Sequence, residues 1–264
     1  MMAQSPATAS LRASTSTPMP ESPGLPPADL LVGASLFLDF DGTLVDIVDR
    51  PDAVAVDAPL AMLMEELADR LQGRLAIISG RPRAEIEALF GHCAFAVGGS
   101  HGLELRWPDG RSKSPEPPSN LPRLIARLRD AATRYPGTLV EEKPFGVALH
   151  YRAAPQHEGA CRHLAQALAE ESGLSLQPGK MVFELRMRGA DKGAALVALL
   201  DEPPMRGTRP IFMGDDLTDE DAFRTAAERG GAGILVGPPR ATAARYRLPD
   251  VTAVRAWLEA ALAA

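Results

Sequence analysis

Asp39 and Asp41 stand two residues apart, directly after the apolar run Leu36-Phe37-Leu38. Side chains at i and i+2 leave a strand on the same side, so the two carboxylates are expected to converge just past its end. Unpaired charges beside a core are costly, which favours a functional reason for them. Converging carboxylates suit Mg²⁺, a hard cation that takes oxygen ligands and shares them with a substrate phosphate. The structural alternative is a plain turn at Asp41-Gly42, with Asp39 as a polar strand end.

Three more motifs follow along the chain, each at the end of an apolar strand pattern or the start of a helix. They are Ser79-Gly80-Arg81-Pro82, Asp191-Lys192-Gly193 and Gly214-Asp215-Asp216-Leu217-Thr218-Asp219-Glu220. A helix N-terminus with free N–H groups favours anions, and a lysine supplies a compact positive charge. Acids at a strand end can hold a metal ion or cap the following helix, and Asp216, Asp219 and Glu220 fit both roles equally.

The elements that must position these motifs alternate between strand and helix. Short apolar stretches predict strands at 35–40, 74–78, 94–98, 209–213 and 232–236, with helices at 60–71, 84–90, 193–200, 219–228 and 251–262. Alternating strands and helices predict a parallel sheet with helices on both faces. Ligands of such sheets bind beyond the carboxyl ends of the strands, which is where Asp39, Ser79 and Asp215 would meet.

The region 104–186 breaks this rhythm. A hairpin turn is predicted at 107–110, and the pattern that follows completes the order β-β-α-β-β-α-β-β of a small inserted α/β domain. We therefore predict a disordered tail at 1–28, a core domain formed by 29–103 and 187–264, and a cap domain at 104–186. The tail is rich in Ser, Thr, Ala and Pro, with no apolar run of the kind found in a signal peptide.

The four motifs, in this order, resemble the phosphotransferases of the haloacid dehalogenase superfamily. The resemblance implies a Rossmann-like α/β core of that type with an inserted cap, and phosphoryl transfer assisted by Mg²⁺. It implies that Asp39 is the nucleophile and Asp41 the acid and base. The other implied roles are phosphate binding by Ser79, Lys192 and Gly42, metal binding by Asp39, Asp41 and Asp215, and support of these groups by Asp216, Asp219 and Thr43. A purely structural role for Thr43 is an equal alternative.

A closer resemblance is to the trehalose-6-phosphate phosphatases, and it runs from about residue 35 to the end of the chain. It is carried by Ser79-Gly80-Arg81-Pro82, His101-Gly102-Leu103-Glu104, Glu141-Glu142-Lys143-Pro144, Phe183-Glu184-Leu185-Arg186 and the acidic segment 214–220. It implies hydrolysis of trehalose 6-phosphate through an aspartyl-phosphate intermediate, as the last step of trehalose biosynthesis. One departure is Met187, where the family usually has proline.

The same resemblance implies that cap residues Glu141, Lys143 and Glu184 bind hydroxyls of the distal glucose, with Arg81 and His101 as further substrate contacts. Carboxylates accept hydrogen bonds from sugar hydroxyls and ammonium groups donate them, so the residue types agree. Each has a plainer alternative. Glu141 and Lys143 also fit a solvated strand face, His101 fits a turn histidine with satisfied hydrogen bonds, and Arg81 fits an ion pair near the helix start.

Composition bounds the partners. The chain has 264 residues, 45% of them hydrophobic, and a formal charge of −6, which gives no electrostatic reason to expect nucleic-acid binding. No apolar stretch reaches the roughly 18 residues of a transmembrane helix. Two cysteines, Cys93 and Cys161, are too few for a disulfide framework. We expect a cytoplasmic monomer that acts on a small sugar phosphate and is coupled functionally to a trehalose-6-phosphate synthase.

Three rival functions remain compatible with parts of the sequence. The core motifs also suit a phosphatase for another sugar phosphate, such as sucrose phosphate or mannosyl-glycerate phosphate, or a phosphosugar mutase. The cap residues argue against these. A non-catalytic sensor or scaffold is disfavoured because a binding module needs no nucleophile and acid together. Dehalogenation is disfavoured because an acidic magnesium loop would then serve no purpose.

Overall fold

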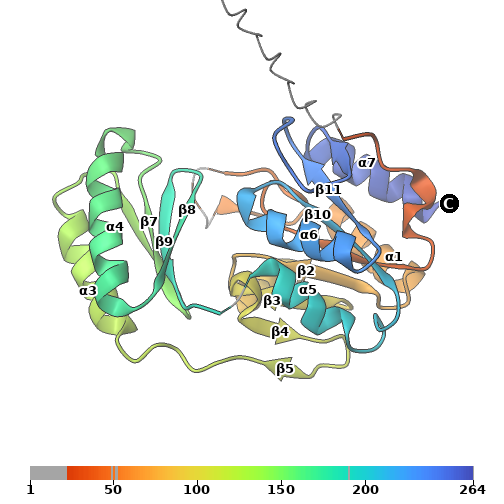
Figure 1. The fold of residues 1–264 in the computed structure, drawn as a ribbon, viewed down its shortest axis with the longest axis horizontal. Helices are drawn as coiled ribbons and strands as arrows, with labels where there is room; N and C mark the ends of the chain where they lie inside the picture. The colour runs from red at the N-terminus through yellow and green to blue at the C-terminus, as the bar shows by residue number, and fades with distance from the viewer. Residues whose placement is uncertain (1–22, 49, 51–52, 190, 264) are drawn as a thin grey trace, which may run out of the picture.

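The computed structural model describes residues 23–48, 50, 53–189 and 191–263. They form two units that lie side by side, a larger one built on a mixed sheet and a smaller one of four strands and two helices (Figure 1). We call the smaller unit, residues 121–186, the insert, because it interrupts the chain of the larger unit, which we call the core unit. The predicted α/β fold with a parallel-sheet core is confirmed.

The core unit contains an eight-stranded sheet. From one edge to the other its strands are β12 (Tyr246–Leu248), β11 (Ala232–Val236), β10 (Arg209–Gly214), β1 (Ala34–Leu38), β2 (Leu75–Ile78), β3 (Ala96–Gly99), β4 (Glu104–Arg106) and β5 (Ser112–Lys113). Neighbours from β12 to β3 pair in parallel, and β4 and β5 add an antiparallel hairpin at the β3 edge. The edge strand β12 is the one parallel strand that the apolar pattern missed, because it is short and carries an arginine.

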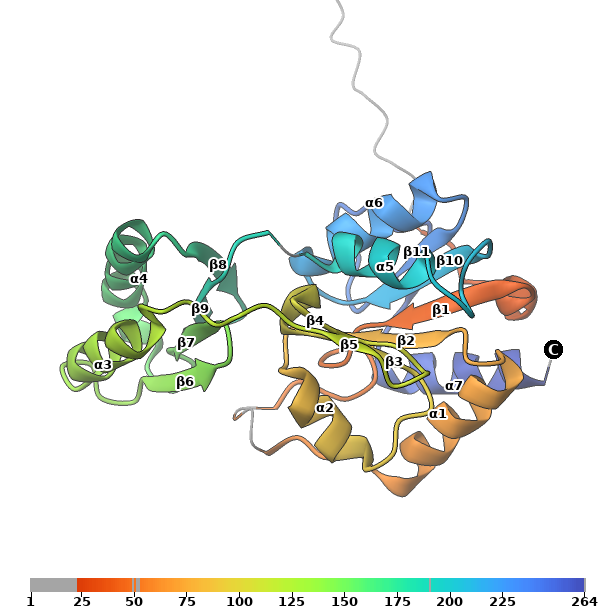
Figure 2. The same ribbon diagram turned by 90° about the horizontal axis from the view of Figure 1, so that it is seen from below.

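Both faces of the sheet are buried, as the unbroken apolar strands require. Along β1, Leu36 and Leu38 pack into one core while Phe37 packs into the other, which is the alternation of an extended strand. The first core is covered by α1 (Ala58–Arg70), α2 (Arg83–Phe90) and α7 (Val251–Leu262), and the second by α5 (Lys192–Leu200) and α6 (Glu220–Glu228) (Figure 2). Short 3₁₀ turns follow Pro27, β3 and β10: η1 (Ala28–Leu31), η3 (Ser100–Gly102) and η5 (Leu217–Asp219).

The insert is a separate antiparallel sheet with helices on one face. Its strands run in the order β6 (Leu139–Lys143), β7 (Gly146–His150), β9 (Val182–Arg186) and β8 (Ser175–Gly179), and its helices are α3 (Leu121–Ala132), α4 (Glu158–Ser172) and the short η4 (Pro155–His157). The helices lie on the outer side, so the opposite face of the sheet is turned toward the core unit (Figure 1). The strand alternation decides what that face carries: Phe183 and Leu185 pack against the helices, and Glu184 between them points the other way.

The structure corrects the position of the predicted hairpin. Residues 104–113 were assigned to the cap, but β4 and β5 pair with β3 and extend the core sheet. The reason is that a hairpin pattern is the same whichever sheet receives it, and β4 continues from β3 through only η3. The first two strands of the predicted β-β-α-β-β-α-β-β order therefore belong to the core unit.

The boundaries at 28 and 187 also shift. Residues 1–22 of the predicted tail lie outside the described residues, but residues 23–28 are packed against the core unit. The Gly24 carbonyl accepts a hydrogen bond from Arg247 N at 2.9 Å, and the Pro26 carbonyl accepts one from the Trp257 indole at 3.0 Å. Met187, predicted as the first core residue, donates its backbone N–H to the Phe145 carbonyl at 3.0 Å and so prolongs the pairing of β7 with β9. Proline at this position would have no N–H to donate.

In the described part of the chain, no helix combines the length and the apolar character needed to cross a membrane.

Candidate active site

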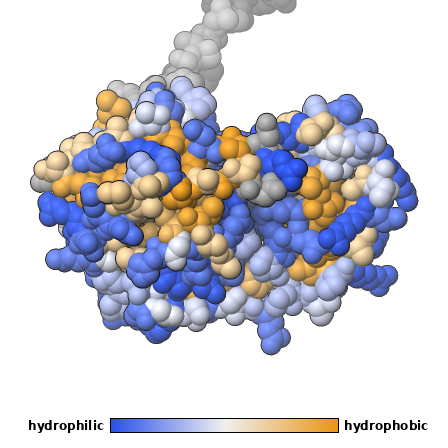
Figure 3. Space-filling model, turned by 180° about the vertical axis from the view of Figure 1, so that it is seen from behind, coloured by the Kyte–Doolittle hydropathy of each residue, from blue (hydrophilic) through white to orange (hydrophobic). Residues whose placement is uncertain are grey.

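A cleft lies between the insert and the carboxyl ends of the parallel strands, and the surface is hollowed between the two units (Figure 3). Its cavity volume is about 220 Å³, and it is open to solvent. The residues that follow β1, β2 and β10 line one wall, and the exposed face of the insert lines the other. Predicted residues from both units meet here: Asp39, Asp41, Ser79, Arg81, His101, Glu141, Lys143, Glu184, Lys192, Asp215 and Asp216.

Asp39 and Lys192 form the buried centre of the core-side wall. The Lys192 ammonium lies 2.7 Å from Asp39 Oδ1 and 2.6 Å from Asp219 Oδ1. Burial raises the pKa of Asp39 well above its usual range, Lys192 opposes this, and the neighbouring acids Asp219 and Asp215 add to it. For Lys192 the effect of burial is outweighed by the two carboxylates, which raise its pKa. The side chain that begins α5 is therefore a permanent cation between two buried acids.

Asp39, Asp215 and Asp219 are close enough to share one cation, since one oxygen from each lies within 4.8 Å of the others. Carboxylate oxygens at the mouth of a cleft are the donors that Mg²⁺ prefers. Asp219 was predicted as a support and Asp41 as a ligand. The structure groups the Asp219 carboxylate with the other two, but this carboxylate also accepts hydrogen bonds from Lys192 and from the Asp216 backbone at 2.8 Å. The residues present therefore fit a divalent cation, with Asp39 and Asp215 as the acids best placed for it.

Gly42 lets the turn after β1 approach the acid cluster. Its φ is +80°, and a Cβ atom there would lie 2.3 Å from Asp215 Oδ2. An L side chain is disfavoured by the backbone conformation and excluded by the contact. Gly42 was predicted from the sequence to bind phosphate. The structure shows that a glycine is needed at this position to leave room for the Asp215 side chain.

We expect Gly42→Ala to destabilise the fold by more than the about 1–2 kcal/mol that positive φ alone costs an alanine, because Asp215 must also move. Gly110→Ala is the matched control: it has a φ of +86° at the hairpin turn, and nothing lies within 4 Å of its Cβ position. Urea unfolding of both variants measures the difference. Equal losses of unfolding free energy would show that Asp215 accommodates the methyl group freely.

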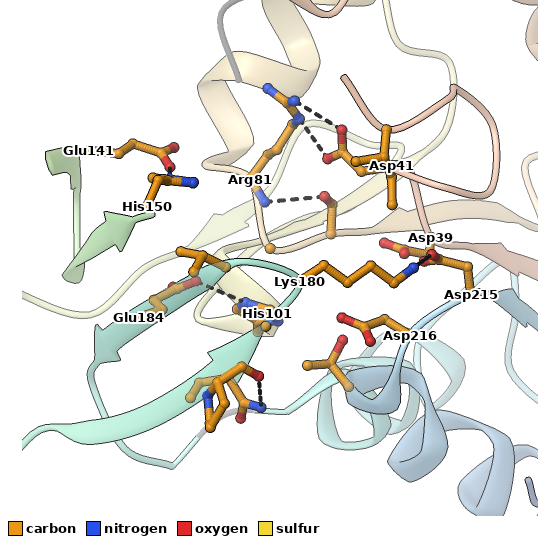
Figure 4. Close-up of a pocket in the computed structure, with 18 of the residues that line it drawn as sticks. Asp39, Asp41, Arg81, His101, Glu141, His150, Lys180, Glu184, Asp215 and Asp216 are labelled. Atoms are coloured by element: carbon orange, nitrogen blue, oxygen red, sulfur yellow. Dashed lines mark hydrogen bonds and ion pairs between the residues drawn. The ribbon is translucent and has the colours of Figure 1, made fainter. Parts of the chain in front are cut away.

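Asp41 points toward a different cation from Asp39. Its carboxylate accepts two hydrogen bonds from Arg81, Nε to Oδ2 at 2.7 Å and Nη2 to Oδ1 at 2.9 Å, and Arg81 also pairs with Glu85 (Figure 4). The two carboxylates therefore line the same cleft without converging on one point. The sequence offered two roles for Arg81, an ion pair near the helix start and a substrate contact. Arg81 pairs with Glu85 in the first turn of α2, and it also borders the cleft. Ser79 Oγ is buried beside it and accepts the Arg81 backbone N–H at 3.1 Å.

The insert-side wall carries the predicted sugar-binding residues in two pairs. Lys143 Nζ lies 3.0 Å from Glu184 Oε2, and His150 Nε2 lies 2.7 Å from Glu141 Oε2. Burial by itself would raise the pKa of Glu184, but Lys143 and His101 hold it well below its ordinary range. Both carboxylates thus remain ionised hydrogen-bond acceptors in the cleft. His150 lies on β7, next to the strand that carries Glu141, and so serves as the hydrogen-bond partner of this carboxylate.

His101 lies at the junction of the two units. It stands in η3, where Ser100 and His101 both have positive φ, 49° and 56°, and Glu104 holds the turn by accepting hydrogen bonds from Ser100 Oγ and from the Arg83 backbone N–H. His101 Nε2 lies 3.7 Å from Glu184 Oε2, and burial lowers its pKa. It therefore borders the cleft and is also held by its turn, while its contact with substrate stays a prediction.

Asp216 and Thr43 are the remaining residues that the sequence assigned to a supporting role. Asp216 begins η5 by accepting the Leu217 backbone N–H at 2.7 Å, and its own N–H is held by Asp219, so part of the acidic segment caps the turn before α6. Thr43 is fully buried, and its hydroxyl has no hydrogen-bond partner among the described residues.

Lys180 is a cleft residue that the sequence analysis missed. It lies at the tip of the β8–β9 hairpin, and its ammonium is 2.5 Å from Asp215 Oδ2 (Figure 4). The available signal was Gly179-Lys180 between two predicted strands of the insert, at the hairpin end that faces the core unit.

The chain matches the family model described as trehalose-phosphatase over residues 37–252. It is 41% identical over 224 residues to a probable trehalose-phosphate phosphatase of Sinorhizobium fredii, with 84% of each chain covered. It is 39% identical over 244 residues to the trehalose-6-phosphate phosphatase of Escherichia coli, covering 92% of this chain and 90% of that one.

Among solved structures, a trehalose-6-phosphate phosphatase related protein superposes with a TM-score of 0.72 at 28% identity, covering 85% of this chain and 95% of that one. The match covers both the core unit and the insert, and the motifs that line the cleft fall within the matched residues. The chain therefore belongs to the trehalose-phosphatase family, within the haloacid dehalogenase superfamily.

Proposed function

We propose that this protein is a phosphomonoesterase that hydrolyses trehalose 6-phosphate to trehalose and phosphate, the last step of trehalose biosynthesis. The observation that carries the proposal is the opposition of two walls across one cleft. The core-side wall holds the Asp39–Lys192 pair at 2.7 Å, and the insert-side wall holds the ionised Glu141, Lys143 and Glu184. The first suits a phosphoryl group and the second suits sugar hydroxyls.

Asp39 acts as the nucleophile in this proposal. Its carboxylate attacks phosphorus, the bond from phosphorus to the sugar oxygen breaks, and an aspartyl phosphate forms. The attack requires the ionised carboxylate, whereas burial and two neighbouring acids raise the pKa of Asp39. When bound at Asp39 and Asp215, Mg²⁺ would supply positive charge that favours this ionised form and offsets the charge of the phosphate. Lys192 supplies part of the same effect permanently from the other side of the carboxylate.

Asp41 protonates the sugar oxygen as it leaves and then takes a proton from the water that attacks phosphorus. This attack breaks the bond from phosphorus to the Asp39 oxygen, which releases phosphate and restores the Asp39 carboxylate. In the structure its two oxygens are occupied by Arg81. Arg81 is therefore expected to turn at least one N–H toward the substrate when the cleft fills, which frees an Asp41 oxygen to carry the proton. Ser79 and Lys192, which both line the cleft, are proposed to hold the non-transferred phosphate oxygens.

The insert is proposed to act as a cap that closes over the sugar. Closure would exclude water during the first half-reaction. In the described part of the chain, the segments before α3 and after β9 connect the two units. If the insert moves in this way, small-angle scattering profiles should differ with and without a phosphate-mimicking ligand. Identical profiles would refute the closure.

The sugar contacts yield a prediction with a control on the same strand. We expect Glu141→Gln to lower kcat/KM for trehalose 6-phosphate by about 10- to 100-fold, the usual cost of losing a hydrogen bond to a charged acceptor, while leaving an aryl phosphate unaffected. The control is Glu142→Gln, because Glu142 points to the other face and pairs with Arg129 of α3. Equal effects of both changes, or equal effects on both substrates, would remove Glu141 from the sugar site.

The proposed substrate is tested by steady-state phosphate release from trehalose 6-phosphate, sucrose 6-phosphate, glucose 6-phosphate and an aryl phosphate. A kcat/KM for trehalose 6-phosphate well above the other three is the expected result. Glucose 6-phosphate and the aryl phosphate have no second sugar for the insert-side wall, and sucrose 6-phosphate presents a different arrangement of hydroxyls to it. Comparable values for all four would keep the core chemistry and discard the sugar-binding role of the insert. Preference for sucrose 6-phosphate would reassign the substrate.

A further inference from the structure

Lys180 is a cation that the insert delivers to the acid cluster of the core unit. Its side chain is about half exposed, whereas that of Asp215 is 8% exposed, and the two groups are 2.5 Å apart. The hairpin tip is held in place, since Arg152 Nη2 donates to the Lys180 carbonyl at 3.1 Å and Met181 beside it has a φ of +63°. This contact is shorter than two other polar contacts between the units, Lys143 to the Gly80 carbonyl at 3.5 Å and His101 to Glu184 at 3.7 Å.

The charges divide into two sets. Lys192 of the core unit forms ion pairs with Asp39 and Asp219, and Lys180 of the insert forms an ion pair with Asp215. One oxygen each of Asp39, Asp215 and Asp219 lies within 4.8 Å of the other two. A divalent cation held by Asp39 and Asp215 would need an Asp215 oxygen that faces these acids. Two cations this close to one carboxylate repel each other. Binding of the metal at Asp215 therefore weakens the ion pair between Asp215 and the Lys180 ammonium, and the reverse also holds.

Lys180 also has a second place to go. It borders the main cleft and a neighbouring hollow lined by Gly42, Asp216 and Arg240, so that it stands between the two. Its flexible four-carbon chain can leave Asp215 without movement of the strands that carry it.

We propose that Lys180 is an internal competitor of the metal ion: in the metal-free protein it latches the insert to the core unit through Asp215, and metal binding at Asp215 releases it. This inference rests on the proposed metal site. It assigns to the metal a second effect besides chemistry, which is to open the cleft for substrate. The latch weakens metal binding, because the apparent Kd for the metal equals the intrinsic Kd divided by the fraction of molecules in which Lys180 has left Asp215.

The test is isothermal titration of the metal-free protein with MgCl₂, and with MnCl₂ as a second probe, in the absence of substrate. If the latch is closed about nine-tenths of the time, Lys180→Met should bind the metal about tenfold more tightly than the unchanged protein. Lys180→Gln should do the same. The control is Lys113→Met on β5, which removes an equal charge from an exposed position outside the cleft. Its metal affinity should stay within about twofold of the unchanged protein.

A structural readout accompanies the titration. Small-angle scattering should show the metal-free unchanged protein to be more compact than metal-free Lys180→Met, and added metal should remove this difference. Equal metal affinities of the unchanged protein and both Lys180 variants would overturn the latch while leaving the metal site intact. Weaker binding by the variants would overturn it too, since Lys180 would then assist the metal. Absence of metal binding in every protein would overturn the metal site and the latch together.

Discussion

Asp39→Asn should abolish turnover, lowering kcat for trehalose 6-phosphate by at least about 10³-fold, because an amide cannot attack phosphorus. The other carboxylate beside Lys192, that of Asp219, is fully buried and already accepts hydrogen bonds from Lys192 and from the Asp216 backbone N–H. The change preserves size, so the fold and the substrate cleft should persist. Phosphate release with Mg²⁺ present measures the loss, and circular dichroism with a thermal melt checks the fold.

The control for this change is Asp46→Asn, an equivalent substitution at an exposed position in the same loop, which should leave kcat within about twofold of the unchanged enzyme. The variant also separates an enzyme from a sensor. A sensor would keep its function after the change at Asp39, whereas an enzyme keeps only binding. Residual turnover within tenfold of the unchanged protein would move the nucleophile elsewhere.

The second large effect is expected from Lys192→Met. Lys192 is 2% exposed and lies between two buried carboxylates, so removing it leaves Asp39 and Asp219 without their cation. Breaking a buried ion pair by deleting one partner costs about 3–5 kcal/mol, and we expect a loss of that size in the free energy of unfolding, with turnover lost as well. Urea unfolding measures it, and Lys113→Met is the exposed control.

The deficit of Lys192→Met should shrink as the pH is lowered. Burial already raises the pKa of Asp39 in the folded protein, and loss of Lys192 removes the group that opposes this. A carboxyl whose folded pKa lies above its unfolded value costs stability once the pH rises through the folded pKa, and this cost disappears when the acid is protonated in both states. A deficit that stayed constant or grew on acidification would show that Lys192 stabilises the fold through packing of its alkyl chain instead of through its charge.

Much of the core-side wall could be predicted from the sequence because parallel strands place their carboxyl ends at one edge. Asp39, Ser79 and Asp215 each follow an apolar strand, so their convergence follows from topology alone once the strands are recognised. Lys192 was assigned through the resemblance to the haloacid dehalogenase superfamily, and the structure places it as the first residue of the apolar helix α5 on that edge.

What the sequence did not predict depends on side-chain contacts between different elements, some of them in different units. Local pattern placed Lys180 on a hairpin but carries no information on which acid it reaches across the cleft. The same holds for Arg81, whose two hydrogen bonds to Asp41 join β1 and α2, and for His150, whose partner lies on the neighbouring strand. Strand periodicity likewise identified the hairpin of β4 and β5 while leaving open which of the two sheets it joins.

Met187 illustrates how a departure from the family pattern acquires a physical meaning. Its backbone N–H is bonded to the Phe145 carbonyl, so the chain stays tied to the insert one residue longer than a proline would allow. The difference lies in the connection between the units and not in either wall of the cleft.

The central claim is metal-assisted phosphoryl transfer to Asp39 from a sugar phosphate held by the insert. Its most direct test is phosphate release from trehalose 6-phosphate by protein stripped with a chelator, before and after stepwise addition of MgCl₂. We predict negligible release from the stripped protein and full recovery that saturates with Mg²⁺. One oxygen of Asp39 lies within 4.8 Å of oxygens of two further acids, and the metal would supply the positive charge that offsets them and the phosphate. Undiminished release from the stripped protein would contradict the claim and require a nucleophile that functions without a metal.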